Sequence, residues 1–349
     1  MRNISAYIFI VFLFIPPGIQ AQQSSPLSNP NISVIGDFRG GYINTGLHNI
    51  DAGIHETEFA FQSAVDPYAK ADFFLSLSRN SAGEWNAEME EAYLTSLKLP
   101  ARLQLKAGKF KNAFGRLNTV HPHALPFIDM PNAFVNFFGE EGLNDEGFSL
   151  DWLVPNPLHY FQQLTLETTS GHLDNPSFMQ SGRNNFLYLA HLKNFWDLSR
   201  NVTLELGLSG VYGPNDSSLA TSIGAADLTY KWKPLQFNTY RSFTWQTEGF
   251  CSRAQSAPGA SVRALGLYSF ITYQVSKRWF LTGRYDFSNI PYSDTFSEQA
   301  FSATAGWYAT EFQKIELEGK YTADNAQNIF YQGFLRWIFV IGSHGAHQY

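Results

Sequence analysis

Hydrophobic and polar residues alternate with a period of two from one end of the chain to the other. Residues 202–209 read VTLELGLS, and residues 315–321 (IELEGKY) and 101–108 (ARLQLKAG) follow the same rule. This period is typical of a β-strand with one apolar and one polar face. Residues 237–250 and 262–275 carry apolar groups on both faces, so their orientation stays open.

Turn-forming residues divide the chain into about sixteen such strands. Short links such as Asp66-Pro67 and Lys233-Pro234 alternate with longer polar links such as 251–261 and 288–296. An up-and-down barrel with tight turns at one rim and longer loops at the other has this order. The predicted strands are 32–43, 54–65, 68–79, 85–98, 101–110, 146–153, 160–169, 185–195, 199–212, 222–232, 237–250, 262–275, 278–287, 297–310, 313–323 and 328–341.

The alternation predicts an all-β fold, a transmembrane antiparallel β-barrel. Hydrocarbon offers no partner to a free backbone N–H or C=O, so a sheet that spans lipid must close on itself. Apolar side chains then face the lipid, and their polar neighbours face a wet lumen. A secreted soluble β-protein, such as a propeller or a solenoid, remains the alternative.

The composition narrows the class of protein. Of the 349 residues, 15% are charged and 16% are aromatic, and the net charge is −6. Ordinary soluble domains have about 25% charged residues. Beyond the first twenty residues no apolar run reaches the roughly 18 residues of a membrane-spanning helix. These values argue against a helical membrane protein, a basic nucleic-acid binder and a disordered chain.

The N-terminus is typical of a secretory signal peptide. Arg2 is followed by an apolar run, a Pro-Pro-Gly break and the small residue Ala21, which predicts a signal peptide over residues 1–21. Residues 22–349 are then a single barrel domain of the bacterial outer membrane, inserted by the barrel-assembly machinery and surrounded by lipid. Cys251 is the only cysteine and cannot form an internal disulfide. No cofactor is expected.

The longest link, residues 111–145, joins the fifth and sixth predicted strands. Such a long stretch in a compact domain is usually functional. It is too apolar to stay in water, so we expect it to fold inward as a third loop that narrows the pore. An external cap over the neighbouring loops is the alternative. Its apolar residues include Phe114, Leu117, Leu125, Phe127, Ile128, Phe134, Val135, Phe137 and Phe138.

Three strings in this region carry a resemblance: AGKFKNAFGRLN (107–118), HPHALPFID (121–129) and GEEGLNDEGFSLDWLVP (139–155). The chain resembles the outer-membrane porin superfamily, and in particular its phosphate- and polyphosphate-type branch. The resemblance implies a passive diffusion channel for small hydrophilic solutes or ions, which often forms a homotrimer. It also implies that the loop after the fifth strand holds the constriction.

Charged residues in and near this loop are the candidate constriction residues. Opposed basic and acidic groups would set up a transverse field that favours polar solutes. The acidic balance predicts a weak preference for cations. The candidates are the basic residues Lys106, Lys109, Lys111 and Arg116 and the acidic residues Asp129, Glu140, Glu141 and Asp145.

Two histidine pairs invite a metal hypothesis. His121 and His123 lie two residues apart, with Asp129 following, and His344 and His347 lie near the C-terminus. Neutral imidazoles with a carboxylate suit Zn²⁺. Neither pair supplies three spaced ligands by itself, so we expect structural or incidental roles.

An enzymatic function is not expected. The chain contains no G-x-S-x-G or comparable serine–histidine pattern. An outer-membrane barrel with a hydrolase, adhesin or structural role remains the alternative to a channel.

Overall fold

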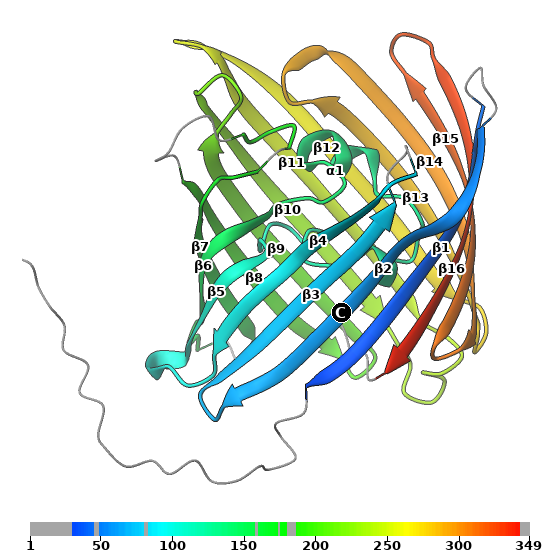
Figure 1. The fold of residues 1–349 in the computed structure, drawn as a ribbon, viewed down its shortest axis with the longest axis horizontal. Coiled ribbons are helices and arrows are strands. Elements are labelled where there is room, and N and C mark those ends of the chain that lie inside the picture. Colours follow the sequence, from blue (N-terminus) through cyan, green and yellow to red (C-terminus); the bar gives the residue numbers. More distant parts are fainter. Residues whose placement is uncertain are drawn as a thin grey trace, which may run out of the picture.

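Sixteen antiparallel strands form one closed barrel in the computed structural model, which describes residues 30–44, 49–79, 83–157, 160–173, 175–179 and 186–342. Each strand pairs with its neighbours along the chain, and β1 pairs with β16 from Ser33–Gly342 to Ile43–Gln332 to close the sheet (Figure 1). This confirms the predicted up-and-down barrel. The strands are β1 (Asn31–Ile43), β2 (Asn49–Asp66), β3 (Ala69–Arg79), β4 (Trp85–Ser96), β5 (Leu103–Lys111), β6 (Asn144–Leu153), β7 (Phe161–Thr169), β8 (Leu187–Ser199), β9 (Val202–Pro214), β10 (Ala220–Trp232), β11 (Phe243–Ala257), β12 (Ala260–Gln274), β13 (Trp279–Ile290), β14 (Ser293–Thr310), β15 (Gln313–Asp324) and β16 (Ile329–Gly342).

In the described part of the chain, helical structure is confined to short pieces. They are α1 (Asn132–Phe138) and the 3-10 turns η2 (Pro100–Arg102) and η3 (Pro122–Ala124). No helix in the described ranges is long and apolar enough to cross a bilayer. The predicted signal peptide (1–21) and the histidines His344 and His347 lie outside the described residues.

The two faces of the strands are inverted relative to a soluble protein. On β15, Leu317 is 62% exposed, whereas the charged Glu316, Glu318 and Lys320 are buried. Lipid requires an apolar outer surface, and polar groups can then be placed only on the inner face. The alternation read from the sequence is therefore the alternation between the outer and inner faces of the barrel.

Three links differ from the prediction. The links expected to be long at 251–261 and 288–296 are tight turns, because β11 runs to Ala257 before β12 starts at Ala260, and β13 runs to Ile290 before β14 starts at Ser293. The link expected to be short at Lys233-Pro234 extends from 233 to 242. Backbone pairing continues through polar residues where a hairpin rises into water, so polarity alone misplaced the strand ends near 251–261 and 288–296.

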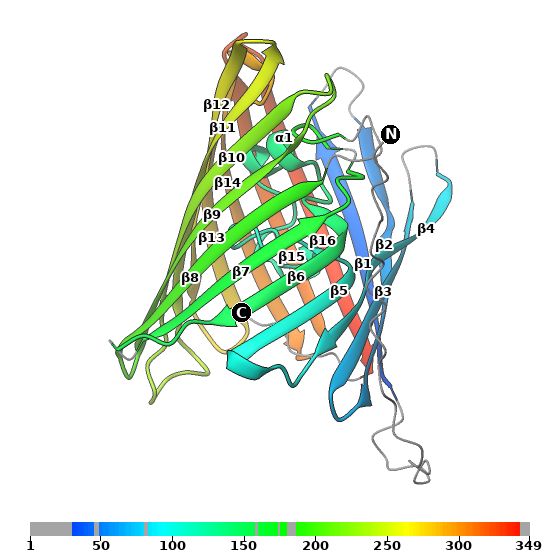
Figure 2. The same cartoon turned by 90° about the vertical axis from the view of Figure 1, so that its left-hand side faces the viewer.

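The inner face of the barrel is apolar on one side. Inward side chains on β8–β12 form a hydrophobic surface, and the segment 111–145, hereafter the long segment, packs against it. Figure 2 shows α1 and the chain next to it within the ring of strands. Helix α1 contacts β12 and β13. The apolar residues on the strands are Leu187, Leu189, Val211, Ile223, Phe250, Tyr268 and Phe270.

Candidate functional site

The two ends of the long segment are tied together at its base. The backbone N–H of Asn112 donates to the carbonyl of Leu143 at 2.9 Å. The buried Asn118 side chain donates to the carbonyl oxygens of Asn112 (2.7 Å) and Leu143 (2.8 Å), and its Oδ1 accepts from the Leu143 N–H at 2.7 Å. One side-chain amide thus substitutes for the backbone ladder that the segment lacks.

Aromatic packing buries the middle of the segment. Phe137 contacts Phe250 of β11 with ring centroids 5.2 Å apart, and Phe127 contacts Phe270 of β12 at 5.3 Å. Four of the seven residues of α1 are buried: Ala133, Phe134, Phe137 and Phe138. Burial of each such side chain contributes on the order of 1.5–3 kcal/mol, so this packing holds the segment on the β8–β12 side.

Inward carboxylates hold the N-terminal part of the segment. Glu167 Oε2 accepts from Asn112 Nδ2 (2.9 Å) and the Ala113 N–H (3.1 Å). Glu248 Oε2 accepts from the Arg116 N–H at 3.2 Å and from the Tyr268 hydroxyl at 2.6 Å. These contacts satisfy backbone donors that no regular structure satisfies.

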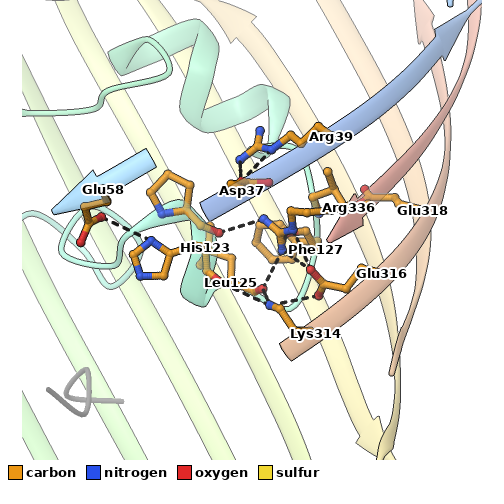
Figure 3. A network of polar contacts seen from close by, with 12 residues as sticks. Asp37, Arg39, Glu58, His123, Leu125, Phe127, Lys314, Glu316, Glu318 and Arg336 are labelled. Carbon is orange, nitrogen blue, oxygen red and sulfur yellow. Dashed lines mark hydrogen bonds and ion pairs between the residues drawn. The ribbon is translucent and has the colours of Figure 1, made fainter. Parts of the chain in front are cut away.

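Two inward cations bind the backbone around η3. Arg336 is fully buried, and its guanidinium donates to the carbonyl oxygens of Pro122 (3.1 Å), Leu125 (3.1 Å) and Phe127 (2.7 Å) while pairing with Glu316 (Figure 3). Lys314 Nζ donates to the carbonyl of Leu125 at 3.1 Å. The segment is therefore attached to β15 and β16 as well as to β8–β12.

Asp129 is fixed by the neighbouring strands. Its carboxylate pairs with Arg284 of β13 (2.9 Å) and with Lys320 of β15. Burial by itself would raise the pKa of Asp129, but the charges of Arg284 and Lys320 outweigh burial and hold this pKa well below its usual range. Asp129 therefore stays ionised and anchors the segment.

A cavity of about 750 Å³ lies between the first part of the long segment and the strands β2–β9. In its lining, Arg116 and Lys193 both pair with Glu205, each at 3.2 Å. Ionisable side chains of both signs line this cavity. They are Lys70, Lys106, Lys111, Arg116, His121 and Lys193 on the basic side and Glu91, Asp151, Glu167 and Glu205 on the acidic side.

A second cavity, of about 520 Å³, lies around the C-terminal end of the segment and is mainly acidic. Lys109 pairs there with Glu88 at 3.2 Å. Burial raises the pKa of Glu141, which also lines this cavity. The acidic residues of the lining are Glu88, Glu140, Glu141, Asp145 and Glu146.

The eight predicted constriction residues thus separate into three groups. Lys106, Lys111 and Arg116 line the first cavity. Lys109, Glu140, Glu141 and Asp145 line the second. Asp129 lines neither, because Arg284 and Lys320 engage it. The expected opposition of the four basic residues to Asp129 and the other three acids is therefore not the observed arrangement.

His121 and His123 contact acidic residues of the strands β2 and β4. Asp129, which the sequence placed near this pair, binds Arg284 and Lys320. His121 Nδ1 lies 3.2 Å from Glu58 Oε2 and 3.4 Å from Glu90 Oε2, and His121 Nε2 lies 2.9 Å from Glu91 Oε1. His123 Nδ1 lies 3.4 Å from Glu58 Oε2. Burial by itself would lower the pKa of His121, but the surrounding carboxylates outweigh burial and raise this pKa well above its usual value.

Sequence reasoning missed the strand residues that complete the site. Glu58, Glu205, Arg284 and Arg336 are charged residues within β-strands, far in sequence from the long segment. Such a charge is costly on the lipid face. A charged residue at a polar position of the alternating pattern is therefore expected to face inward, and this signal could have identified these residues.

Comparisons with known proteins support the fold. No family model matches the chain. It is 26% identical over 376 aligned positions to an uncharacterized protein of Aquifex aeolicus (strain VF5), covering 94% of this chain and 76% of that protein. An anion-selective porin from Comamonas acidovorans matches with a TM-score of 0.59 at 9% identity, over 90% of this chain and 99% of that one. The outer membrane channel DcaP of Acinetobacter baumannii matches with a TM-score of 0.59 at 11% identity, over 90% and 98%. At such identities the likeness to the two structures concerns the fold.

Proposed function

We propose that the chain is an outer-membrane porin, a passive diffusion channel for small hydrophilic solutes or ions whose lumen is narrowed by the long segment. The observation that carries the proposal is the charged cavity of about 750 Å³ between that segment and the strands β2–β9. If the long segment only stabilised the barrel, we would expect close packing beside β2–β9 like the packing beside β8–β12, and no cavity.

The charges around the cavity support a polar permeant. Rings of ionised side chains make a pore favourable for ions and polar solutes and unfavourable for apolar ones. Basic and acidic groups are both present in this lining, which argues for weak selectivity. The resemblance to phosphate- and polyphosphate-type porins stays a prediction, and so does the weak preference for cations.

The outer surface and the fold support the location. Exposed apolar side chains cover the outer face, and the two compared structures are described as a porin and an outer membrane channel. We accordingly place the barrel in outer-membrane lipid, delivered by the signal peptide and the barrel-assembly machinery, with a homotrimer as the family's common assembly and no enzymatic role.

Single-channel recording with thiol modification tests the proposal. In a Cys251→Ser background, Lys193→Cys places a thiol in the cavity lining. The matched control is Leu192→Cys, because the outer-face residue Leu208, 47% exposed, pairs with Leu192. We expect stepwise conductance from both variants, and a fall in conductance on adding a bulky charged thiol reagent only for Lys193→Cys.

Two results would contradict the proposal. A folded barrel with no conductance would favour the enzymatic or adhesive alternative. Equal responses to the reagent at positions 192 and 193 would mean that the cavity is not on the conduction path.

A further inference from the structure

Two histidines of the long segment and acidic residues of β2 and β4 form a buried cluster at the edge of the first cavity. The side chains of Glu58, His121, His123 and Glu90 are each at least nine-tenths buried. One potential ligand atom from each of Glu58, His121 and His123 lies within 4.8 Å of the other two. We propose that this cluster binds a divalent transition metal ion of the Zn²⁺ type.

The spacing of the donor atoms fits a tetrahedral ion. Metal–ligand bonds of about 2.0–2.1 Å place neighbouring ligand atoms of a tetrahedron about 3.3 Å apart. Glu58 Oε2 lies 3.2 Å from His121 Nδ1 and 3.4 Å from His123 Nδ1. Glu90 Oε2 lies 3.4 Å from His121 Nδ1. Two imidazole nitrogens and one carboxylate oxygen are a donor set that favours Zn²⁺ over Ca²⁺ or Mg²⁺, and the Glu90 carboxylate lies beside His121 as a further oxygen donor.

The other nitrogen of His121 has the partner that metal-bound histidines have. His121 Nε2 lies 2.9 Å from Glu91 Oε1, on the side of the ring away from Glu58. A carboxylate at this position fixes the orientation of the ring and increases the basicity of the nitrogen that binds the metal. Glu91 would act as a positioning residue, and a further hydrogen bond from the Lys111 N–H at 3.1 Å holds it.

The cluster contains more carboxylates than basic side chains, which favours the binding of a cation. Oxygen atoms of Glu56, Glu58 and Glu90 lie within 4.8 Å of one another, and Glu58 Oε1 is buried with no hydrogen-bond partner among the described residues. Buried carboxylates in contact repel one another unless a cation lies between them, and a metal ion would replace there the proton that these carboxylates favour on His121. His121 and Glu91 line the first cavity, so an ion can reach the cluster from there.

A bound ion would link the long segment to β2 and β4. The segment's other described anchors lie mainly on β7, β9, β11, β13, β15 and β16. This inference concerns metal binding alone and does not depend on whether the barrel conducts.

Calorimetric titration of the full chain with ZnCl₂ in detergent tests the site. We expect one Zn²⁺ per barrel, no binding at this site in His121→Gln/His123→Gln, and affinity lowered roughly 10- to 100-fold in Glu91→Gln. The control is His172→Gln, an exposed histidine outside the cluster, which should bind as the unaltered protein does. Excess Ca²⁺ should not compete.

A second arm separates the cluster from the C-terminal histidines. In a His344→Gln/His347→Gln background, Co²⁺ should give the intense visible absorption of a tetrahedral site, removed by added Zn²⁺. This measurement leaves the cluster unaltered, so it decides the question even if the cluster variants fail to fold. Loss of all binding in this background, or only the weak spectrum of octahedral Co²⁺, would overturn the proposal.

Discussion

Asn118 and Leu143 lie 25 residues apart in the chain, and two hydrogen bonds join them: the Asn118 amide accepts from the Leu143 N–H at 2.7 Å and donates to its carbonyl at 2.8 Å. The pair closes the base of the long segment as a ladder of backbone bonds would close a hairpin. Both residues are buried, so water cannot replace either bond if the side chain is lost.

Asn118→Ala should loosen the base of the segment while leaving the barrel closed. Each buried group left unsatisfied costs about 1–3 kcal/mol. Hydrogen exchange measured by mass spectrometry should therefore show protection at Leu143 reduced by about tenfold or more. Asn328→Ala makes the same chemical change at an exposed turn and should leave Leu143 protected. Unchanged exchange in Asn118→Ala would show that the bonds contribute little.

Gly115→Ala should displace the first part of the segment. Gly115 has φ +59°, and an added Cβ would lie 1.7 Å from Glu248 Oε1. The left-handed conformation alone costs a non-glycine residue about 1–2 kcal/mol, and the collision would add to it by moving the carboxylate that holds Arg116. We expect a lower midpoint of urea unfolding. Gly283→Ala, whose Cβ would meet nothing within 4 Å, should leave the midpoint close to its original value.

Arg336→Met should be the most destabilising of these changes. The substitution removes the guanidinium that pairs with Glu316 and that donates hydrogen bonds to three carbonyl oxygens of the segment. Removal of one partner of a buried ion pair costs about 3–5 kcal/mol, although Lys314, 3.2 Å from Glu316, should reduce this loss. The free energy of unfolding in urea measures the effect. Arg263→Met at an exposed position is the control.

A double variant tests whether the charge or the carbonyl contacts of Arg336 matter more. In Arg336→Met/Glu316→Gln the orphaned carboxylate is neutral. Recovery of most of the lost stability would assign the cost to the buried charge. A double variant as unstable as Arg336→Met would assign it to the carbonyls of Pro122, Leu125 and Phe127.

The sequence was sufficient to predict the barrel because lipid imposes one rule on every strand. A residue such as Leu317 must face outward and its neighbours Glu316 and Glu318 inward, and this alternation is visible without any knowledge of the partners. The same rule does not apply where a hairpin rises into water, which explains the wrong ends predicted near 251–261.

The site could be predicted only in part. The sequence indicated that the long segment needs burial, because many apolar residues fall within this one stretch of the chain. It could not indicate that Arg336 meets Phe127, because such contacts depend on the stagger of all sixteen strands around the barrel. Asp129 was grouped with the pore charges for the same reason. Its partners Arg284 and Lys320 come from strands more than 150 residues away.

Acid should release the part of the segment around Asp129. Because Arg284 and Lys320 lower the pKa of Asp129 in the folded protein, its ion pairs stabilise the fold above the unfolded pKa of about 3.9. That stabilisation is lost as the pH falls through the lowered folded pKa. Pepsin cleavage within 111–145 should therefore increase as the pH falls below about 4.

Asp129→Asn is the informative comparison for this pH dependence. It lacks the ion pairs at every pH, so its cleavage should be faster at pH 4 and should change less as the pH falls. Asp216→Asn, in the turn between β9 and β10, should behave as the unaltered protein does. Identical pH profiles for Asp129→Asn and the unaltered chain would assign the acid sensitivity to other carboxylates.

Lys193→Glu should shift the ion selectivity of the channel toward cations. Lys193 lines the first cavity and pairs with Glu205 at 3.2 Å, so the substitution replaces a positive charge of the lining with a negative one. A unit charge about 6 Å from a permeating ion contributes roughly 0.7 kcal/mol in water. Reversing the charge therefore changes the energy of each ion by about 1.4 kcal/mol, in opposite directions for cations and anions, so the cation-to-anion permeability ratio changes by up to about a hundredfold at low salt.

Reversal potentials across a salt gradient measure this ratio, and their dependence on salt distinguishes a pore charge from a distant one. The effect should shrink as the Debye length falls from about 10 Å at 0.1 M to about 3 Å at 1 M salt. Lys277→Glu makes the same change of charge in the link between β12 and β13, away from the cavity lining, and should leave the ratio nearly unchanged. If both variants shifted the ratio equally, the net charge of the barrel, and not the cavity beside Glu205, would determine which ions pass.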